Sequence, residues 1–253
     1  MLHGKSLCIV GGTGYLGSAI ARQAFYLGAK VSSISRSGAP KQLQEWQKNI
    51  EYIQADASNP DSFEVQLLQS DATIYTIGTL IDTSITKRSN PGEPGTYEHL
   101  NRDCAMKIGN KLNDFSVQKK LVYLSAQGHP PFIHRYIETK EQAEKYLLDL
   151  NNVKTCVLKP GFIYSYQERK WSIPLKYTLD AWGCIHSFIG KSIPQNTLMN
   201  QLYNELYVEK SIQLEAVVNA AIYSALHESS NGKIWFNSDM EKYQDRLQDL
   251  KDQ

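Results

Sequence analysis

Leu7-Cys8-Ile9-Val10-Gly11-Gly12-Thr13-Gly14-Tyr15-Leu16-Gly17 is the stretch that decides the fold. An apolar run breaks into glycines and then continues as an Ala-containing segment, which predicts a strand, a tight turn and a helix. Gly11 permits the turn, Gly14 lets a ligand approach the backbone, and Gly17 brings the helix close to the strand. Glycine triplets also occur in ordinary turns. A position between a strand and a helix, however, is the context of a dinucleotide-binding fingerprint, in which helix N–H groups face the phosphates.

The composition limits the classes of function that need to be considered. The 253 residues include 27 basic and 26 acidic side chains, a net charge of +1, so no global field favours nucleic acid or an anionic membrane. No apolar run reaches the roughly 18 residues of a membrane-spanning helix. The four cysteines form no Cys-x-x-Cys pair and are expected to be buried thiols in a reducing compartment. No paired His, Cys or carboxylate spacing supports a metal site.

The first 44 residues contain no Asp or Glu but carry five Lys or Arg side chains among several serines. This composition is typical of a mitochondrial import segment. It equally suits the half of a dinucleotide site that binds phosphates, where carboxylates would repel the ligand. The stretch cannot be a discarded presequence, because it contains the first predicted strand.

The end of the second predicted strand, residues 30–35, indicates which dinucleotide is bound. Binders of NADH usually place an acid here to hold the ribose 2′-hydroxyl, whereas an Arg accommodates the 2′-phosphate of NADPH. The strand runs into Ser35-Arg36-Ser37-Gly38, without an acid. We therefore expect NADPH rather than NADH, with Arg36 on the 2′-phosphate.

Alternating strand and helix patterns continue to residue 161. Strands are predicted at 51–55, 72–77, 120–125 and 155–158, and helices at 41–49, 60–68, 97–112 and 136–150. This rhythm predicts an α/β fold with a doubly wound parallel sheet of the Rossmann type and ligands at the carboxyl ends of the strands. A dinucleotide-binding domain is expected over 1–161, a small C-terminal substrate or partner subdomain over 162–240 with a helix at 212–227 and a strand at 233–236, and a polar tail over 241–253.

Several residues at the predicted strand ends are candidates for cofactor contacts. Asp56 either accepts the adenine amino group or forms a turn before Asn59-Pro60, and Gly78 would let backbone lie beside the cofactor. Residues 82–96 are rich in Pro and Gly and are expected to form a lid or a disordered loop. The candidate cofactor-binding residues are Gly11, Thr13, Gly14, Tyr15, Leu16, Gly17, Arg36, Asp56, Ala57, Gly78, Lys140 and Pro160.

Three further residues could carry chemistry. Tyr136 and Lys140 are four apart on one predicted helix face, where the ammonium would lower the pKa of the phenol and hold the nicotinamide ribose. Ser125 ends the fifth predicted strand and would polarise a substrate carbonyl. The Tyr-x-x-x-Lys spacing recurs at Tyr26 and Tyr166, but only Tyr136 opens a helix after a strand that ends in Ser. The catalytic candidates are therefore Ser125, Tyr136 and Lys140, and the alternative is a surface Tyr beside a solvated Lys.

Together the glycine turn, Ser125, Tyr136, Lys140 and Lys159-Pro160-Gly161 resemble an atypical short-chain dehydrogenase/reductase over residues 5 to about 165. Within that superfamily, segments 34–38, 123–126 and 136–144 resemble two mitochondrial groups. One is the dehydrogenase-like coenzyme Q biosynthesis protein of fungi, and the other is the Rossmann-fold accessory subunit of respiratory complex I. The resemblance implies bound NADPH in a matrix-facing protein near quinone chemistry.

The chain departs from the family pattern in two places. Ser125 precedes Tyr136 by only eleven residues, through Gly128-His129-Pro130-Pro131, and Lys159 replaces the Arg that is common before Pro-Gly. The short link argues against a roomy carbonyl pocket. His129 and His134 lie in it and are either proton shuttles or solvated side chains, while His186 is interpreted as structural.

Residues 162–207 break the strand and helix rhythm and contain nine aromatic residues but few acids. Aromatic side chains are enriched at interface hot spots and membrane boundaries, so the region either docks on a partner or covers its own core.

Three functions remain open from the sequence. The first is an NADP(H)-binding accessory protein of the mitochondrial quinone machinery, with a mainly structural cofactor, peripheral on the matrix side of the inner membrane and docked on a membrane-associated assembly through residues 162–207. The second is an active NADPH-dependent reductase, or an epimerase or dehydratase, that uses the Ser-Tyr-Lys triad. The third is a cytoplasmic redox sensor that reads NADPH.

Overall fold

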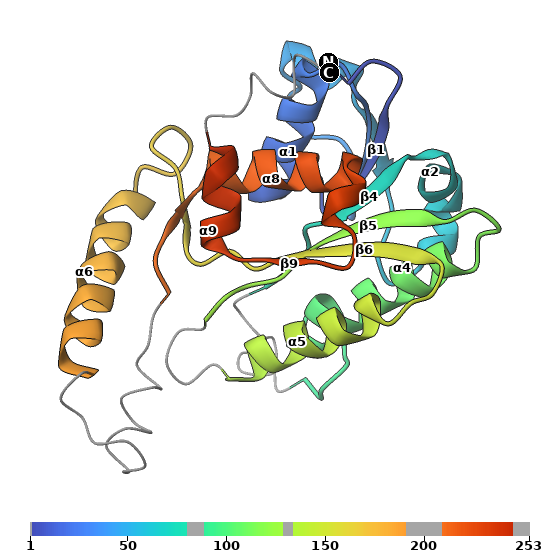
Figure 1. Ribbon diagram of the computed structural model, residues 1–253. Helices are drawn as coiled ribbons and strands as arrows, with labels where there is room; N and C mark the ends of the chain where they lie inside the picture. The colour runs from blue at the N-terminus through green and yellow to red at the C-terminus, as the bar shows by residue number, and fades with distance from the viewer. Residues whose placement is uncertain (1, 80–88, 129–133, 191–208, 245–253) are drawn as a thin grey trace.

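A computed structural model describes residues 2–79, 89–128, 134–190 and 209–244 of the chain. Seven parallel strands form one sheet in the order β3-β2-β1-β4-β5-β6-β9 (Figure 1). This order confirms the predicted α/β doubly wound sheet. The strands are β1 (Ser6–Val10), β2 (Lys30–Ser35), β3 (Glu51–Gln54), β4 (Ala72–Tyr75), β5 (Lys119–Leu124), β6 (Val153–Leu158) and β9 (Ile234–Trp235).

The central strands are apolar because helices cover both faces of the sheet. All four residues of β4 and the last four of β1 are buried. Ile9 faces one hydrophobic core, while Cys8 and Val10 on the same strand face the other. The first core is covered by α1 (Tyr15–Tyr26), α8 (Leu214–Leu226) and α9 (Asn237–Met240), and the second by α2 (Glu64–Gln69), α4 (Cys104–Asn113) and α5 (His134–Leu148) (Figure 1).

Three predicted helices have a different local geometry. The helix expected at 41–49 is a short 3₁₀ turn, Glu45–Asn49, and the one expected at 60–68 begins as a 3₁₀ turn, Pro60–Phe63, before α2. The helix expected from residue 97 begins as a π turn, η3 (Glu98–Asp103), and continues as α4. The hydroxyls of Tyr75 and Tyr123 donate to the carbonyl oxygens of Leu100 and Asn101 at 2.7 and 2.6 Å. These buried phenols engage backbone acceptors in the wide turn and support its π geometry.

The C-terminal half differs most from the sequence prediction. Ile212–Gln213 is not the start of a helix but a short strand, β8, that pairs in parallel with β7 (Ile163–Tyr164). The prediction named no regular element in residues 162–207, yet a long helix, α6 (Ser172–Gly190), lies there. Residues 82–88 of the expected loop, residues 191–207 of the aromatic region and residues 245–253 of the tail lie outside the described residues, and short 3₁₀ turns occupy Glu228–Ser230 and Glu241–Tyr243.

Helix α6 projects away from the sheet (Figure 1). Lys176 donates to Asp180 at 2.8 Å, and Asp180 accepts hydrogen bonds from the N–H and the hydroxyl of Ser211 at 2.9 and 2.7 Å. Five large apolar side chains on the helix or just before it are exposed. We call this set the α6 outer face, and it comprises Trp171, Leu175, Trp182, Ile185 and Phe188.

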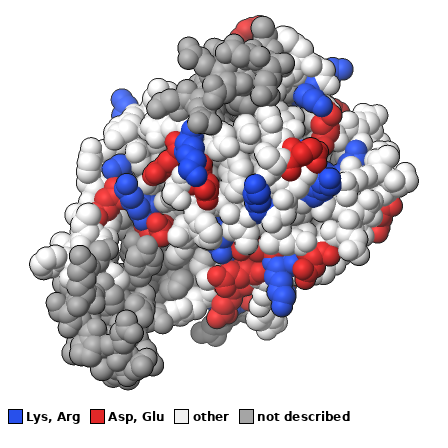
Figure 2. Space-filling model, viewed as in Figure 1, with Lys and Arg blue, Asp and Glu red and all other residues white. Residues whose placement is uncertain are grey.

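Elsewhere the surface carries mixed charge. Figure 2 shows basic and acidic side chains interspersed on the face drawn, without an extended field of one sign. Within the described parts of the chain, every helix is too short or too polar to cross a membrane.

Candidate functional site

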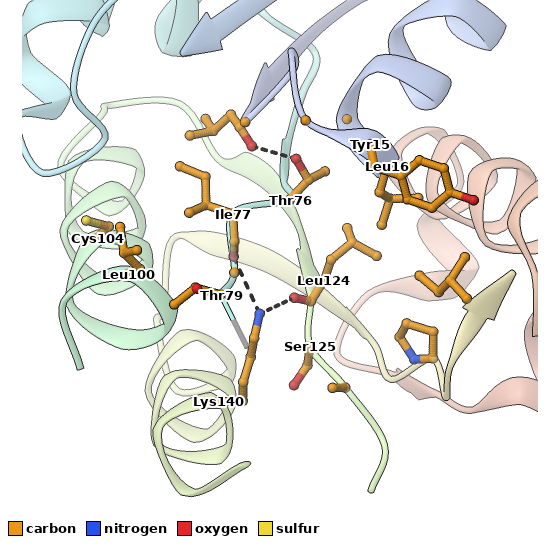
Figure 3. A pocket seen from close by; sticks show the side chains of 18 of the residues that line it. Tyr15, Leu16, Thr76, Ile77, Thr79, Leu100, Cys104, Leu124, Ser125 and Lys140 are labelled. Atoms are coloured by element: carbon orange, nitrogen blue, oxygen red, sulfur yellow. Dashed lines mark hydrogen bonds between the residues drawn. The ribbon is translucent and has the colours of Figure 1, made fainter. Parts of the chain in front are cut away.

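A cavity of about 880 Å³ opens at the carboxyl ends of the central strands, where β1 and β4 are neighbours and their connections diverge to opposite sides of the sheet. The Thr76 hydroxyl, just after β4, donates to the carbonyl of Val10 at the end of β1 at 2.9 Å, which ties the two strand ends together (Figure 3). Every candidate cofactor-binding and catalytic residue from the sequence lines this one cavity. The structure thus brings the candidates together, while their roles remain predictions.

The glycine turn has the geometry that a bound phosphate requires. Gly11 has φ of +90° and donates its N–H to Ile34 O at 2.8 Å. A Cβ at Gly17 would overlap the carbonyl of Gly11, so only glycine permits this close approach of helix and turn. Helix α1 begins after Gly14 with no side-chain cap and no acid in its first turn. Its N-terminal N–H groups and dipole therefore favour an anion at this end of the cavity.

At the end of β2 the cavity wall is polar and carries a positive charge. Arg36 and Ser37 are exposed there, and the Ser37 hydroxyl lies 3.3 Å from that of Thr13 in the glycine turn. Gln54 on the neighbouring strand donates to the backbone carbonyl of Arg36 at 3.2 Å, which anchors the residue but leaves its guanidinium outside that bond. This arrangement suits a phosphate on a ribose 2′ position.

Asp56 forms the turn considered from the sequence, and its contact with adenine stays a prediction. One of its oxygens accepts the N–H of Ser58 at 2.8 Å, as in a turn, and this bond is the largest cause that lowers the pKa of the carboxyl. The residue also lines the cavity beside Ala57. The prediction of no metal site rested on linear spacing, but the fold brings ligand atoms of Asp56, His99 and Cys104 within 4.8 Å of one another. Burial raises the pKa of the Cys104 thiol to about 12.

Lys140 enters the cavity wall from α5 (Figure 3). Its ammonium is buried, donates to the carbonyls of Leu124 at 2.8 Å and Ile77 at 3.5 Å, and lies 5.1 Å from the centre of the Tyr123 ring. Burial lowers the pKa of Lys140 to about 8, against the attraction of Glu144, which raises it. A Cβ at Gly78 would lie 3.0 Å from the Lys140 nitrogen, so glycine there leaves room for the ammonium.

Ser125 has a partner that the sequence did not predict. Its hydroxyl donates to the buried carboxylate of Glu144, and the other oxygen of Glu144 accepts from Lys159 at 3.0 Å. We expected Ser125 to donate to a substrate carbonyl. In the structure that proton is engaged by Glu144, because α5 places the carboxylate one helical turn beyond Lys140, under the end of β5.

The pKa of Tyr136 shifts in the direction opposite to the prediction. We expected Lys140 to lower it, but burial raises it to about 12, and the neighbouring phenol of Tyr97 adds to the rise. The two tyrosine rings meet edge to face with centres 5.9 Å apart. The Lys140 ammonium donates instead to the carbonyls of Leu124 and Ile77, and burial dominates the shift of the Tyr136 pKa.

Sequence reasoning missed several residues of this site. Glu144 had a usable signal, since it lies four residues after Lys140 and therefore on the same helix face. Asn101 is buried in the π turn, where its side-chain oxygen accepts the N–H of Thr79 at 3.0 Å. Arg169 stacks on Tyr15 at the cavity wall, with its guanidinium carbon 3.6 Å from the ring centre. Only the fold brings Asn101 to the chain after β4 and Arg169 to the glycine turn.

The histidines considered from the sequence do not line the cavity among the residues described. His134 is exposed as the first residue of α5, and His186 is buried on α6, in agreement with its structural interpretation. His129 lies outside the described residues.

Known structures share this architecture over nearly the whole chain. WbmF of Bordetella bronchiseptica, solved with NAD⁺, matches with a TM-score of 0.61 and 16% identity over 99% of this chain and 79% of its own. A short-chain dehydrogenase/reductase superfamily protein of Agrobacterium tumefaciens, solved with NAD, matches with a TM-score of 0.60 and 10% identity over 95% of this chain and 81% of its own. The chain has the fold of short-chain dehydrogenases and epimerases. The epimerase Mth375 of Methanothermobacter thermautotrophicus also matches, with a TM-score of 0.59 and 15% identity over 92% and 71% of the two chains.

Curated relatives are more similar in sequence than these structures, but they match a smaller share of the chain. An uncharacterized chloroplastic protein of Arabidopsis thaliana is 33% identical over 163 residues, 63% of this chain and 51% of its own, so the chain spans about half the length of that relative. MIOREX complex component 2 of Saccharomyces cerevisiae is 24% identical over 62% of this chain and 72% of its own. The mitochondrial protein FMP52 of Coccidioides immitis is 28% identical over 64% and 67%. No family model matches the sequence.

Proposed function

We propose that this chain binds NADP(H) in the cavity between the glycine turn and Lys140. The observation that carries the proposal is the glycine turn, whose backbone geometry and helix N-terminus suit a pyrophosphate at the point where the strand order reverses. Arg36, Ser37 and Thr13 favour the 2′-phosphorylated dinucleotide, because they offer a cation and hydroxyls where NADH binders place an acid. Neighbours in fold that were solved with NAD⁺ or NAD support a nicotinamide dinucleotide as the ligand class.

In this proposal the dinucleotide is mainly a structural ligand. Three features argue against a triad prepared for proton transfer: the Ser125 proton is engaged by Glu144, the pKa of Tyr136 is raised, and Lys140 donates to backbone carbonyls. A ligand that binds only the folded state still stabilises it through mass action, by about 2.7 kcal/mol at a concentration 100 times Kd. The protein would then report or depend on NADP(H) without consuming it.

We further propose a mitochondrial setting, as an accessory protein of the quinone machinery at the matrix side of the inner membrane. A mitochondrial relative and the resemblance to complex I and coenzyme Q proteins support this, although none of the relatives described above is named for either system. The partner would dock on residues 162–207. In the described part of that region, Trp171 and Phe188 of the α6 outer face are 63% and 79% exposed, an apolar surface of the kind that partners cover.

A reductase, or an epimerase or dehydratase, is the second candidate. The specific observation in its favour is that Ser125, Tyr136 and Lys140 line the same cavity as the glycine turn. The dinucleotide would supply hydride transfer when bound. Tyr136 would then exchange a proton with a substrate oxygen, and Lys140 would bind the ribose. While the Ser125 hydroxyl donates to Glu144, Ser125 could only accept a hydrogen bond from substrate. It could donate one only if it gave up the bond to Glu144.

The experiment that tests the main proposal is mass spectrometry of nucleotide released from the purified protein. We expect NADP⁺ or NADPH in stoichiometric amount. Stoichiometric NADH or NAD⁺, or a nucleotide-free protein that binds neither form on titration, would overturn the assignment.

Structural use and catalysis are separated by Tyr136→Phe, which retains the ring and removes the proton. A variant that keeps its NADPH affinity and still supports the protein's role in cells favours the structural cofactor. Loss of NADPH oxidation or of that role, at unchanged affinity, favours the enzyme. Docking is tested by crosslinking and by flotation with mitochondrial membranes, in which a Trp171→Ser/Phe188→Ser variant should be released if the α6 outer face binds.

A further inference from the structure

Three side chains with different ligand atoms meet at the edge of the cavity that Asp56 lines. Asp56 follows β3, His99 lies in the π turn η3, and Cys104 is the first residue of α4. Their ligand atoms lie within 4.8 Å of one another, and the Cys104 sulfur is 3.9 Å from Nε2 of His99. Burial increases from the exposed Asp56 through His99 to the buried Cys104, so the cluster has one closed side and one side toward the cavity.

The π turn explains why His99 and Cys104 are neighbours. In an α-helix, residues five apart point about 140° away from each other around the axis. Here the N–H of Cys104 donates to the carbonyl of His99, an i→i+5 bond, which places the two residues one turn apart. The hydroxyls of Tyr75 and Tyr123, described above, support this wide turn. The juxtaposition is therefore built into the fold rather than produced by long side chains.

The donor set selects a type of cation. A thiolate, an imidazole nitrogen and a carboxylate are ligands of Zn²⁺, whereas Ca²⁺ and Mg²⁺ prefer oxygen alone. Around a tetrahedral zinc, bond lengths of roughly 2.0 to 2.3 Å put neighbouring ligand atoms about 3.4 to 3.6 Å apart. The 3.9 Å between sulfur and imidazole nitrogen is close to that value, and a ligand oxygen of the exposed Asp56 lies within 4.8 Å of the ligand atoms of His99 and Cys104. The fourth position would face the cavity.

The surrounding charges couple such a cation to the dinucleotide. One oxygen of Asp56 accepts the N–H of Ser58 and the other can face a cation. Lys107 donates to the carbonyl of Ser58 and so helps to fix this turn. Arg36, Lys107 and Asp103 all lie close enough to act on Cys104 electrostatically. The two positive side chains would repel a bound cation, and the carboxylate of Asp103 would attract it. Arg36 is also the residue that we assign to the 2′-phosphate, so a bound dinucleotide would keep the guanidinium near the cluster.

We propose that Asp56, His99 and Cys104 bind Zn²⁺ at the adenine side of the cavity, and that Zn²⁺ and the dinucleotide exclude each other. The exclusion rests on the proposed function, because it requires the adenine to contact Asp56. Zinc would thereby control how much of the protein carries NADP(H).

Cobalt is the probe for the site, since Co²⁺ occupies zinc sites and a thiolate ligand gives it a near-ultraviolet charge-transfer band. The parent for the experiment is Cys184→Ser, which removes the exposed thiol of α6 that could bind metal adventitiously. Titration should give the band at one Co²⁺ per chain, with displacement by Zn²⁺. Cys104→Ser in this parent should abolish the band, and His99→Gln should weaken Co²⁺ binding at least tenfold.

Cys156→Ser is the matched control, because Cys156 is a second buried thiol on β6, outside the cavity lining. It should leave the cobalt band unchanged. Circular dichroism and thermal unfolding of Cys104→Ser show whether that variant is folded, and His99→Gln provides the same comparison without altering the buried thiol. A parent that gives no band, or a band that survives in Cys104→Ser, overturns the zinc site.

Competition is measured by repeating the cobalt titration with saturating NADPH. We expect the apparent Kd for Co²⁺ to rise at least tenfold. An unchanged Kd overturns the exclusion while leaving the metal site in place. Failure of NADPH to bind in the absence of metal would instead overturn the proposed function, so the two failures are distinguishable.

Discussion

Replacing Lys140 by Met should remove a gain in stability that the parent protein shows between pH 7 and pH 10, because that gain comes from the buried ammonium of Lys140. The ordinary pKa of 10.5 falls to about 8 in the folded protein, so charging this side chain disfavours folding. At about 1.36 kcal/mol per unit, the cost is about 3 kcal/mol at pH 7, where Lys140 is charged in both states. Between pH 8 and 10.5 the unfolded chain binds more protons than the folded one. The parent protein therefore gains this contribution as the pH rises.

The Lys140→Met variant would lack both the charge and the hydrogen bonds to Leu124 and Ile77. Removing the charge stabilises the variant by about 3 kcal/mol at pH 7. Each hydrogen bond lost from a charged donor costs about 1.5 to 3 kcal/mol. Together the two bonds cost about 3 to 6 kcal/mol, so at pH 7 their loss equals or exceeds the gain from removing the charge. From pH 7 to pH 10 the parent should gain about 2 to 3 kcal/mol over Lys140→Met.

Urea unfolding followed by tryptophan fluorescence at pH 7 and pH 10 measures this difference in the free energy of unfolding. The parent and the variant share their tyrosines and cysteines, so the contributions of these groups cancel when the two proteins are compared. Lys145→Met, on the exposed side of the same helix, is the control and should show a pH-independent difference. A Lys140→Met difference that is equal at the two pH values would refute the buried ammonium.

Two other predictions concern the site and a third concerns ion pairs on the surface. Arg36→Asp should shift the preference from NADPH toward NADH by at least tenfold in fluorescence titrations, and an unchanged ratio would show that Arg36 does not contact the 2′-phosphate. Gly17→Ala should lower the free energy of unfolding by more than about 2 kcal/mol in urea and weaken dinucleotide binding, because its Cβ has no room beside Gly11, whereas the exposed Gly4→Ala should retain binding. Glu228→Gln should be less stable than the parent at pH 7, because two lysines lower the pKa of this exposed carboxyl from 4.5 to about 2, and the difference should shrink as the pH falls through that range; urea unfolding followed by circular dichroism at pH 7 and at pH 2 to 3 would measure it, and an equal difference at both pH values would contradict the ion pairs.

Much of the fold could be predicted because its strands are short apolar runs between turn residues. Strand β2 matches its predicted limits, and β1 differs by a single residue at its start. Helix α6 was missed since its apolar side faces outward and it contains Pro174 and Gly183, which resemble helix breakers. Pro174 is tolerated in the first turn, where the N–H would be unpaired anyway. Ile212 joins a strand rather than a helix because it pairs with Ile163. A local sequence pattern could not predict this pairing, since the two residues are distant in sequence.

The composition of the site was predictable, but the state of its protons was not. Candidates at strand ends line one cavity because parallel strands all deliver their carboxyl ends to the same edge of the sheet. The proton of Ser125 and the pKa of Tyr136 depend instead on what packs beside them, Glu144 and Tyr97, each from another segment. The cluster of Asp56, His99 and Cys104 required a π turn, for which the sequence carries no signal that we recognised.

The pairing of β7 with β8 makes the intervening chain a replaceable module. Residues 165–211 leave and return at a two-stranded sheet in which Ile163 lies opposite Ile212 and Tyr164 opposite Gln213. Within the described residues of that excursion the seven-stranded sheet has no strand, so its registers do not depend on the excursion's length. Since loop-closure entropy grows only slowly with length, a shorter or foreign segment could be grafted between β7 and β8 at little cost in that entropy, with loss of the Arg169 contact to Tyr15. Phe162 and Ile163 would still line the cavity mouth, and the nucleotide half could be recombined with new surfaces.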